Sequence, residues 1–187
     1  MTTRGFTVFD SPIGPVGIAW SAAGIIGVQL PEGSTAKTRA RLRERWPGAV
    51  EGEPPRAIRR TIDAITRLLR GKPATLTEVV LDMEGVPPFH QRVYTAARSI
   101  PPGQTLSYGE LAAQLGVPGG ARAVGQALAK NPFALIVPCH RVLAASGRVG
   151  GFTANGGVST KLRLLTLEGT SLPSKKPPRR GPHALRV

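Results

Sequence analysis

The sequence predicts an α+β protein in which a small β-sheet domain precedes a mainly helical one. Short strand patterns separated by turns rich in Pro and Gly occupy residues 6–30. Helical spacing of apolar residues dominates after residue 86. With 187 residues, 41% of them apolar, the chain can bury a core as one domain or as two small ones.

The first part of the chain predicts a sheet and a helix. Strand patterns at residues 6–9, 16–20 and 25–30 favour a small antiparallel meander. The charged segment 35–46 is typical of a helix that ends before Pro47.

A stronger helix is predicted after Pro55. Its apolar residues recur at helical spacing: Ile58, Ile62, Ile65 and Leu69. Gly71 predicts the end of this helix, and residues 77–81 predict one edge strand. No residue of this half suggests chemistry.

The composition divides the chain into domains. Residues 82–88 have the punctuation of a linker, with Gly85 and two prolines. We therefore predict an α/β domain at residues 1–85 and a second domain at 86–170. Residues 171–187 are basic and Pro-rich without apolar periodicity, which predicts a disordered tail that adds electrostatic reach.

A helix-turn-helix is predicted in the second domain. Residues 107–115 and 120–130 have helical patterns around a short turn that contains glycine. Ser107 and Glu110 form a capping box at the first helix, and Asn131 suits the end of the second. Helical hairpins without a nucleic-acid role share this pattern.

The start of the second helix is made of small residues. They are Gly120, Ala121, Ala123 and Gly125. Arg122 and Gln126 are almost the only long polar side chains, whereas a major-groove reading helix needs several. Two interpretations stay open: close approach to a minor groove with Arg122 entering the base stack, or tight packing of the helix within the protein.

Charge predicts the partner. The chain has 25 Lys and Arg against 11 Asp and Glu, a net charge of +14. This balance favours nucleic acid over a merely soluble basic surface or a membrane. No apolar stretch of about 18 residues is present, and the N-terminus lacks the hydrophobic core of a signal peptide. With one unpaired cysteine, these features predict a cytoplasmic protein.

Cys139, the single cysteine, follows an apolar run and precedes His140. A lone thiol forms no internal disulfide. Burial would make it an inert core residue, whereas the imidazole and the basic charge favour a reactive thiolate. The residues alone leave both interpretations open.

Several motifs, in order, resemble the O6-alkylguanine-DNA alkyltransferases. They are FHQRVY at 89–94, IPPGQT at 100–105, SYGELA at 107–112, ARAVG at 121–125, NP at 131–132 and PCHRV at 138–142. The resemblance covers residues 86–170, and DSPIG at 10–14 looks like the start of the family's first domain.

The resemblance implies a fold and a function. A ribonuclease H-like domain with an antiparallel sheet would precede a winged helix-turn-helix alkyltransferase domain. The protein would bind double-stranded DNA through the minor groove, flip O6-alkylguanine and take its alkyl group irreversibly in one turnover, with O4-alkylthymine as a slower substrate. It would be a monomer that can cluster along DNA, would not contact membranes, and would need neither cofactor nor metal.

The resemblance also assigns catalytic roles. Cys139 would be the nucleophile, and His140 would remove its proton through a water molecule. Glu168 would orient the imidazole, and Asn131 would tie the recognition helix to the active-site loop. The sequence adds support for Glu168, because it lies one turn beyond an inward stripe that we expect to consist of Val158, Leu162 and Leu165.

Further residues would hold substrate and DNA. The implied substrate-binding residues are Tyr108, Arg122, Leu128, Val149, Gly150, Phe152 and Thr153. The implied DNA-binding residues are Ser107, Gly120, Ala121, Arg122, Ala123 and Gly125.

Three features depart from the family pattern. The loop at 152–157 is about two residues longer than the common form, and Phe152 stands where the family often has Tyr. The zinc ligands that some relatives carry in the first domain are absent, because neither Cys nor His precedes His90. The regulatory domain of adaptive-response members is also absent.

Two other function classes are weighed against transfer. A non-catalytic lesion sensor of the alkyltransferase-like type would lack the cysteine, so the presence of Cys139, His140 and Glu168 favours transfer. A cysteine hydrolase is disfavoured because adjacent side chains diverge and a hydrolase would not need the small-faced helix.

Overall fold

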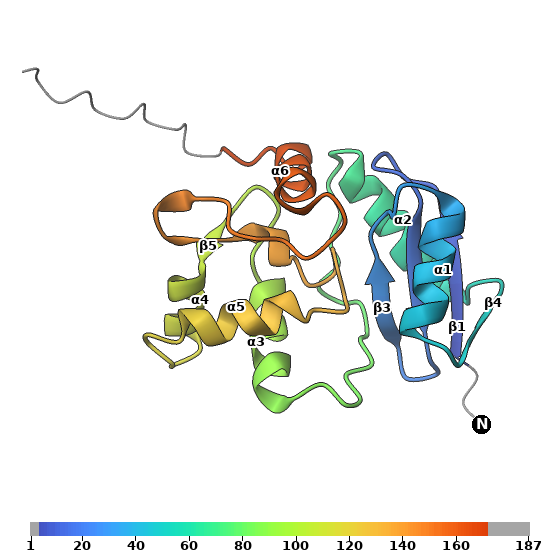
Figure 1. The fold of residues 1–187 in the computed structure, drawn as a ribbon, viewed down its shortest axis with the longest axis horizontal. Helices are drawn as coiled ribbons and strands as arrows, with labels where there is room; N and C mark the ends of the chain where they lie inside the picture. Colours follow the sequence, from blue (N-terminus) through green and yellow to red (C-terminus); the bar gives the residue numbers. More distant parts are fainter. Residues whose placement is uncertain (1–3, 172–187) are drawn as a thin grey trace, which may run out of the picture.

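The computed structural model describes residues 4–171, and its N-terminal part is a four-stranded sheet (Figure 1). The strands are β1 (Arg4–Phe9), β2 (Val16–Trp20), β3 (Ile25–Gln29) and β4 (Ala49–Glu51), in the order β3-β2-β1-β4. The first three form the predicted antiparallel meander. The sheet as a whole is mixed, because β4 pairs parallel with β1. The prediction of a purely antiparallel sheet was therefore wrong.

The parallel strand follows from the connection that precedes it. Helix α1 (Thr35–Arg45) carries the chain from β3 across the sheet and returns it at the β1 edge. A crossover of this kind brings a strand in parallel. At three residues, β4 is too short to show a strand pattern in the sequence.

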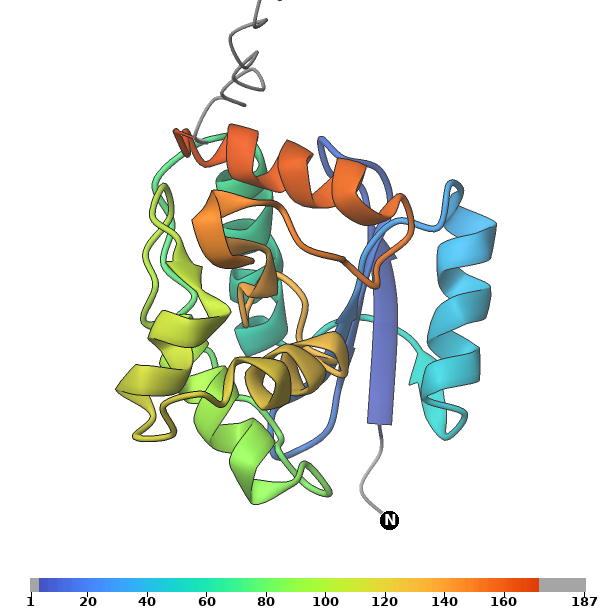
Figure 2. The same cartoon turned by 60° about the vertical axis from the view of Figure 1, so that its left-hand side comes forward.

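The two faces of the sheet are covered differently. Figure 2 shows α1 on one face, with α2 (Arg56–Leu69) and the helical part on the other. Phe6, Ala19 and Leu42 form a small core beneath α1. The larger core includes residues from both halves of the chain, so the sheet and the helical part share buried surface.

The strand predicted at residues 77–81 is not present. Only Leu81 makes an isolated bridge, to Ile25. The guanidinium of Arg98 instead donates to the carbonyl oxygens of Leu76, Thr77 and Val79, at 2.9, 2.6 and 2.7 Å. These carbonyl groups are therefore satisfied by a side chain and not by a neighbouring strand.

The second half contains the expected helices. They are α3 (Pro88–Arg98), α4 (Tyr108–Gln114), α5 (Ala121–Ala129) and α6 (Gly157–Leu167). Two 3₁₀ turns, η1 (Cys139–Arg141) and η2 (Ala145–Gly147), and a two-stranded parallel sheet of β5 (Leu106–Ser107) and β6 (Val142–Leu143) complete it. The capping box is confirmed: Ser107 N donates to Glu110 Oε2 at 2.6 Å, and Glu110 N donates to Ser107 Oγ at 3.1 Å.

Strand β3 also holds the segment that leads to the cysteine. Val28 N donates to Pro132 O at 2.8 Å, beside a bridge between Val28 and Phe133. None of the helices within residues 4–171 is long and apolar enough to cross a membrane. The tail predicted at 171–187 lies, after its first residue, outside the described residues.

Candidate active site

A tight loop delivers Cys139 from the end of α5. Asn131 Nδ2 donates to Val137 O at 2.9 Å, and Phe133 N donates to Asn131 Oδ1 at 2.8 Å. Within this loop Leu135 has φ 71°, the one positive φ outside glycine among the described residues. A buried leucine in this conformation is strained, so the surrounding hydrogen bonds must hold it.

The backbone then turns sharply at Pro138. Cys139 N donates to Val137 O at 2.8 Å across Pro138, whose φ and ψ of −81° and 66° form an inverse γ-turn. Cys139 begins η1 directly after this turn and is half-buried. Its neighbour His140 is 1% exposed. The turn thus directs the two adjacent side chains into different surroundings.

Cys139 opens into two adjoining cavities. One, of about 410 Å³, is lined by Tyr108, Leu128, Phe152 and Thr153. The other, of about 240 Å³, reaches β3 and α1 and includes Asn131 in its wall. The ring of Tyr108 also lies against Gly125 and Gly150, where a Cβ would be 3.8 and 3.5 Å from it. The first cavity is therefore roofed by an aromatic ring and reaches the thiol.

A buried carboxylate lies behind the cysteine. His140 Nε2 and Glu168 Oε1 are 2.9 Å apart, and the Glu168 side chain is 3% exposed. Arg141 clamps the same carboxylate, with Nε donating to Oε2 at 2.9 Å and Nη2 donating to Oε1 at 2.8 Å. Arg141 Nη1 donates in addition to Ile100 O at 2.5 Å. The buried charge of Glu168 is thus paired and fully hydrogen-bonded.

These contacts decide the protonation of the group. Burial alone would raise the pKa of Glu168, but the hydrogen bonds and charges of His140 and Arg141 hold it at about 2. An ionised carboxylate only accepts hydrogen bonds, so Nε2 of His140 carries the proton. Nδ1 is then the basic nitrogen, and among the described residues it is buried without a hydrogen-bond partner. The imidazole is therefore set up to accept a proton at Nδ1.

Burial keeps both reactive groups neutral at rest. It raises the pKa of the Cys139 thiol, against the opposing effects of the Asn131 hydrogen bond and the charge of Lys161. It lowers the pKa of His140 despite the neighbouring carboxylate. A neutral thiol needs a base at the moment of attack, and a neutral imidazole can be that base.

Lys161 is a buried cation that faces this site from α6. It is 0% exposed, and its Nζ donates to Val142 O at 2.6 Å and lies 5.7 Å from the centre of the Tyr108 ring. Burial lowers its pKa, whereas the charge of the Cys139 thiolate raises it. The inward stripe of α6 is Lys161, Leu164 and Leu165. The predicted stripe was therefore wrong for Val158, which is 42% exposed, and for Leu162, which is half-buried.

We expect Lys161→Met to slow reaction of Cys139 at neutral pH by about ten-fold, because a thiolate that loses a nearby cation has a higher pKa. Alkylation of Cys139 by iodoacetamide as a function of pH measures the shift. Lys161→Arg retains the charge and should react close to the parent rate. An unchanged pH profile in Lys161→Met would mean that the cation does not act on the thiol.

Of the small residues at the start of α5, Ala123 is exposed, whereas Gly120, Ala121 and Gly125 are half-buried. Arg122 and Ala123 are exposed at the start of α5, whereas Val124, Ala127 and Leu128 are buried. Ala123 is therefore not used for packing within the protein, whereas Gly125 packs against the ring of Tyr108. Gly120 forms the N-cap and Ala121 begins the helix.

The structure brings together most of the residues named from the sequence. Around the thiol lie Asn131, Tyr108, Leu128, Phe152 and Thr153, with Gly150 against Tyr108 and the pair His140–Glu168 behind. Val149 does not line either cavity, and Arg122 and Ser107 lie outside both. Sequence reasoning missed Arg141 and Lys161. A signal existed for Lys161, since its position is three residues before Leu164 on the inward side of α6.

The comparisons with known proteins agree over most of the chain. The family described as "6-O-methylguanine DNA methyltransferase, DNA binding domain" matches residues 88–170. A methylated-DNA–protein-cysteine methyltransferase of Mycobacterium tuberculosis (strain ATCC 25618 / H37Rv) is 40% identical over 90% of this chain and 94% of its own length. A protein of the same name from Methanothermobacter thermautotrophicus is 37% identical over 86% of this chain and 83% of its own.

Solved structures give the same result. The Mycobacterium tuberculosis OGT in complex with DNA has a TM-score of 0.72 at 37% identity, covering 88% of this chain and 92% of that one. The O6-methylguanine-DNA methyltransferase of Pyrococcus kodakaraensis has a TM-score of 0.65 at 26% identity, covering 88% and 99%. These similarities agree with the cysteine, imidazole and carboxylate that the structure assembles in the matched domain. The chain therefore belongs to the methylated-DNA–protein-cysteine methyltransferase family of DNA repair enzymes.

Proposed function

We propose that the protein removes an alkyl group from O6-alkylguanine in duplex DNA and keeps it on Cys139 as a stable thioether. The observation that carries this proposal is the relay behind the thiol. Glu168 fixes the proton on His140 Nε2, and the buried Nδ1 is left to accept another. The neutral thiol of a half-buried cysteine that directly precedes this base in the sequence suits nucleophilic attack at carbon.

The reaction balances without a cofactor. The thiol proton passes through a water molecule to His140 Nδ1, and the resulting imidazolium is stabilised by Glu168. The sulfur forms a bond to the alkyl carbon as the bond from that carbon to O6 breaks. Guanine leaves with the electron pair and takes up one proton from water, and the imidazolium of His140 returns its proton to water, so that no net proton is gained or lost. Since the thioether has no path back to a thiol, each chain reacts once.

Delivery of the base would depend on the helix-turn-helix. The exposed Ala123 and the other small residues at the start of α5 suit close approach to a minor groove, and the exposed Arg122 can fill the space of an extruded nucleotide. Ser107, Gly120, Ala121, Ala123 and Gly125 would lie along the phosphates and the groove. Tyr108 would contact the flipped guanine and help to turn the adjoining phosphate.

The larger cavity at Cys139 would hold the guanine. Leu128 and Phe152 supply apolar walls, and the Thr153 amide and hydroxyl would meet the O6 and N7 edge. Gly150 would border the pocket through its contact with the Tyr108 ring, and Asn131 would keep the loop in register with α5. The same pocket would accept O4-alkylthymine, at a lower rate.

We assign the alkyl-transfer unit to residues 86–170 as a winged helix-turn-helix, after a ribonuclease H-like unit at residues 1–85. The matching family spans residues 88–170, which supports this boundary. The protein would act as a monomer that can cluster along DNA, in the cytoplasm.

Transfer in a single turnover predicts a fixed stoichiometry. With duplex DNA containing O6-methylguanine in excess, the number of methyl groups gained per chain should rise to one and stop. Intact mass and repaired DNA, measured together, check this result. More than one repaired lesion per chain would contradict the stable thioether, and tight lesion binding without any mass gain would favour the non-catalytic sensor.

A further inference from the structure

Helix α2 carries a stripe of arginines along its exposed face. Four arginines of α2 and the arginine at its C-cap point to one side: Arg56, Arg59, Arg60, Arg67 and Arg70. At 3.6 residues per turn these positions fall within an arc of about 100°. All five are exposed, and the opposite face buries Ile58, Ile65 and Leu68. We call these five residues the arginine stripe.

The stripe is not neutralised by the described part of the chain. None of its five residues forms an ion pair within residues 4–171, whereas Arg39 and Arg43 of α1 both pair with Glu51. Asp63 is the single acidic residue of α2. Like charges three and four residues apart destabilise a helix, so α2 keeps a repulsion that an anionic partner would relieve.

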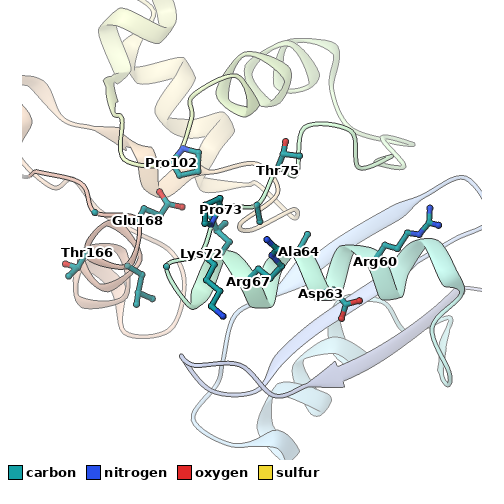
Figure 3. A pocket seen from close by; sticks show the side chains of 15 residues that line it. Arg60, Asp63, Ala64, Arg67, Lys72, Pro73, Thr75, Pro102, Thr166 and Glu168 are labelled. Carbon is teal, nitrogen blue, oxygen red and sulfur yellow. The ribbon is translucent and has the colours of Figure 1, made fainter.

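A groove runs beside the stripe. It has a volume of about 1030 Å³ and is bordered by Arg60 and Arg67 of α2 and by Lys72 (Figure 3). The other wall is Pro102 with the last two residues of α6 and the two residues that follow the helix, 166–169. Asp63 of α2 also lines the groove, so three cations and one carboxylate on this side border the concave surface in which a polymer backbone would lie.

This surface lies apart from the two cavities at Cys139, although its far wall includes Glu168 of the relay. No residue of α2 lines either cavity at Cys139. Figures 1 and 2 both show α2 packed between the sheet and α6, away from the turn between α4 and α5. A lesion held at α5 would thus leave the stripe free.

We propose that the arginine stripe binds the phosphate backbone of a second segment of duplex DNA while α5 holds the lesion. The proposal rests on the proposed function, since it takes α5 as the lesion-binding helix. From Arg56 to Arg70 the stripe is about 21 Å long, which matches about six successive phosphates of one strand. Guanidinium groups also bind phosphate oxygens in pairs.

Other anionic partners fit less well. A membrane surface would require bulky apolar residues beside the cations, and the stripe has none. Proteins of this family act on DNA, so other segments of duplex DNA lie close to the protein whenever it is bound to a lesion.

The test is a two-duplex capture assay. A short biotinylated duplex with O6-methylguanine is loaded with the Cys139→Ser protein, free protein is washed away, and a fluorescent undamaged duplex is added. Arg56→Gln/Arg60→Gln/Arg67→Gln should lower the captured fluorescence at least about ten-fold, because three phosphate contacts are lost. The matched control is Lys37→Gln/Arg39→Gln/Arg43→Gln, which removes the same charge from α1 and should capture the second duplex like the parent.

Two outcomes would overturn the proposal: undiminished capture by the stripe variant, or an equal loss in both triple variants. Undiminished capture would mean that the second duplex binds to another surface. An equal loss in both variants would mean that capture depends only on the net charge of the protein. Methyl transfer to Cys139 on the short duplex is measured separately in the cysteine-containing proteins. The stripe variant should keep the parent rate there, so failure of the alkyl-transfer function would be seen independently of the capture result.

Discussion

Glu168→Ala is expected to destabilise the protein by about 3–5 kcal/mol, because it leaves the buried guanidinium of Arg141 without its counter-ion. It should also slow methyl transfer by about 10²- to 10⁴-fold, since His140 loses the partner that fixes its tautomer. Urea unfolding measures the first effect, and single-turnover repair of an O6-methylguanine duplex measures the second.

A double variant separates the two effects. Glu168→Ala/Arg141→Met removes both buried charges and should recover part of the stability, because no charge is then left buried without its partner. The repair rate should stay low, since His140 is still without a carboxylate. If the double variant also recovered full activity, Glu168 would act only through stability.

The same carboxylate makes stability depend on pH. The pKa of Glu168 is depressed from 4.5 to about 2 in the folded protein, so its contribution is complete above pH 4.5 and is lost as the pH falls towards 2. The pKa of His140 is also lowered, so protonation of the unfolded chain below pH 6.5 acts in the same direction. The free energy of unfolding should therefore fall on acidification, and less steeply in Glu168→Gln between pH 4.5 and 2.

Arg122→Ala is expected to slow repair of duplex DNA by about 10- to 100-fold, while reaction with free O6-benzylguanine stays close to the parent rate. Flipping the nucleotide out of the duplex costs a few kcal/mol of stacking and pairing free energy, which Arg122 would partly offset by filling the gap. Free O6-benzylguanine does not have to be flipped, so its reaction does not include this cost. Single-turnover rates with the two substrates give the ratio directly.

The position of Arg122 allows a clean control. It is exposed at the start of α5 and lines neither cavity at Cys139, so its loss should not disturb the pocket. Gln126→Ala, on the same exposed helix, should change neither rate appreciably. If Arg122→Ala slowed the reaction with both substrates equally, Arg122 would not act by filling the space of the flipped nucleotide.

Local patterns predicted the elements whose causes are local. The helix at α2 was predicted from its apolar period and Pro55, and the capping box fixed the start of α4. The parallel strand β4 could not be predicted, because its pairing with β1 is set by the α1 crossover. The segment 77–81 has a strand composition. Arg98 of α3, however, donates hydrogen bonds to carbonyl oxygens in and next to this segment, so they do not pair with a strand.

The candidate site divides in the same way. Cys139 and His140 are adjacent in sequence, so their motif was visible, and Glu168 followed from the family resemblance and the end of α6. The spacing of Lys161 and Leu164 could have placed Lys161 on the inward side of α6, but the partners of Arg141 and Lys161, Glu168 and β6, are set by tertiary contacts. Val158 was predicted inside because it is apolar, whereas the α6 helix turns it to the surface and buries Lys161 instead.

The most direct test of the account is the site of the transferred group. After incubation with duplex DNA that carries one O6-methylguanine, peptide mass mapping should find one added methyl group, on the peptide that contains Cys139. The Cys139→Ser protein should bind the same duplex and gain none. A methyl group on another residue, or repair of the lesion by Cys139→Ser, would contradict the assignment of Cys139 as the acceptor.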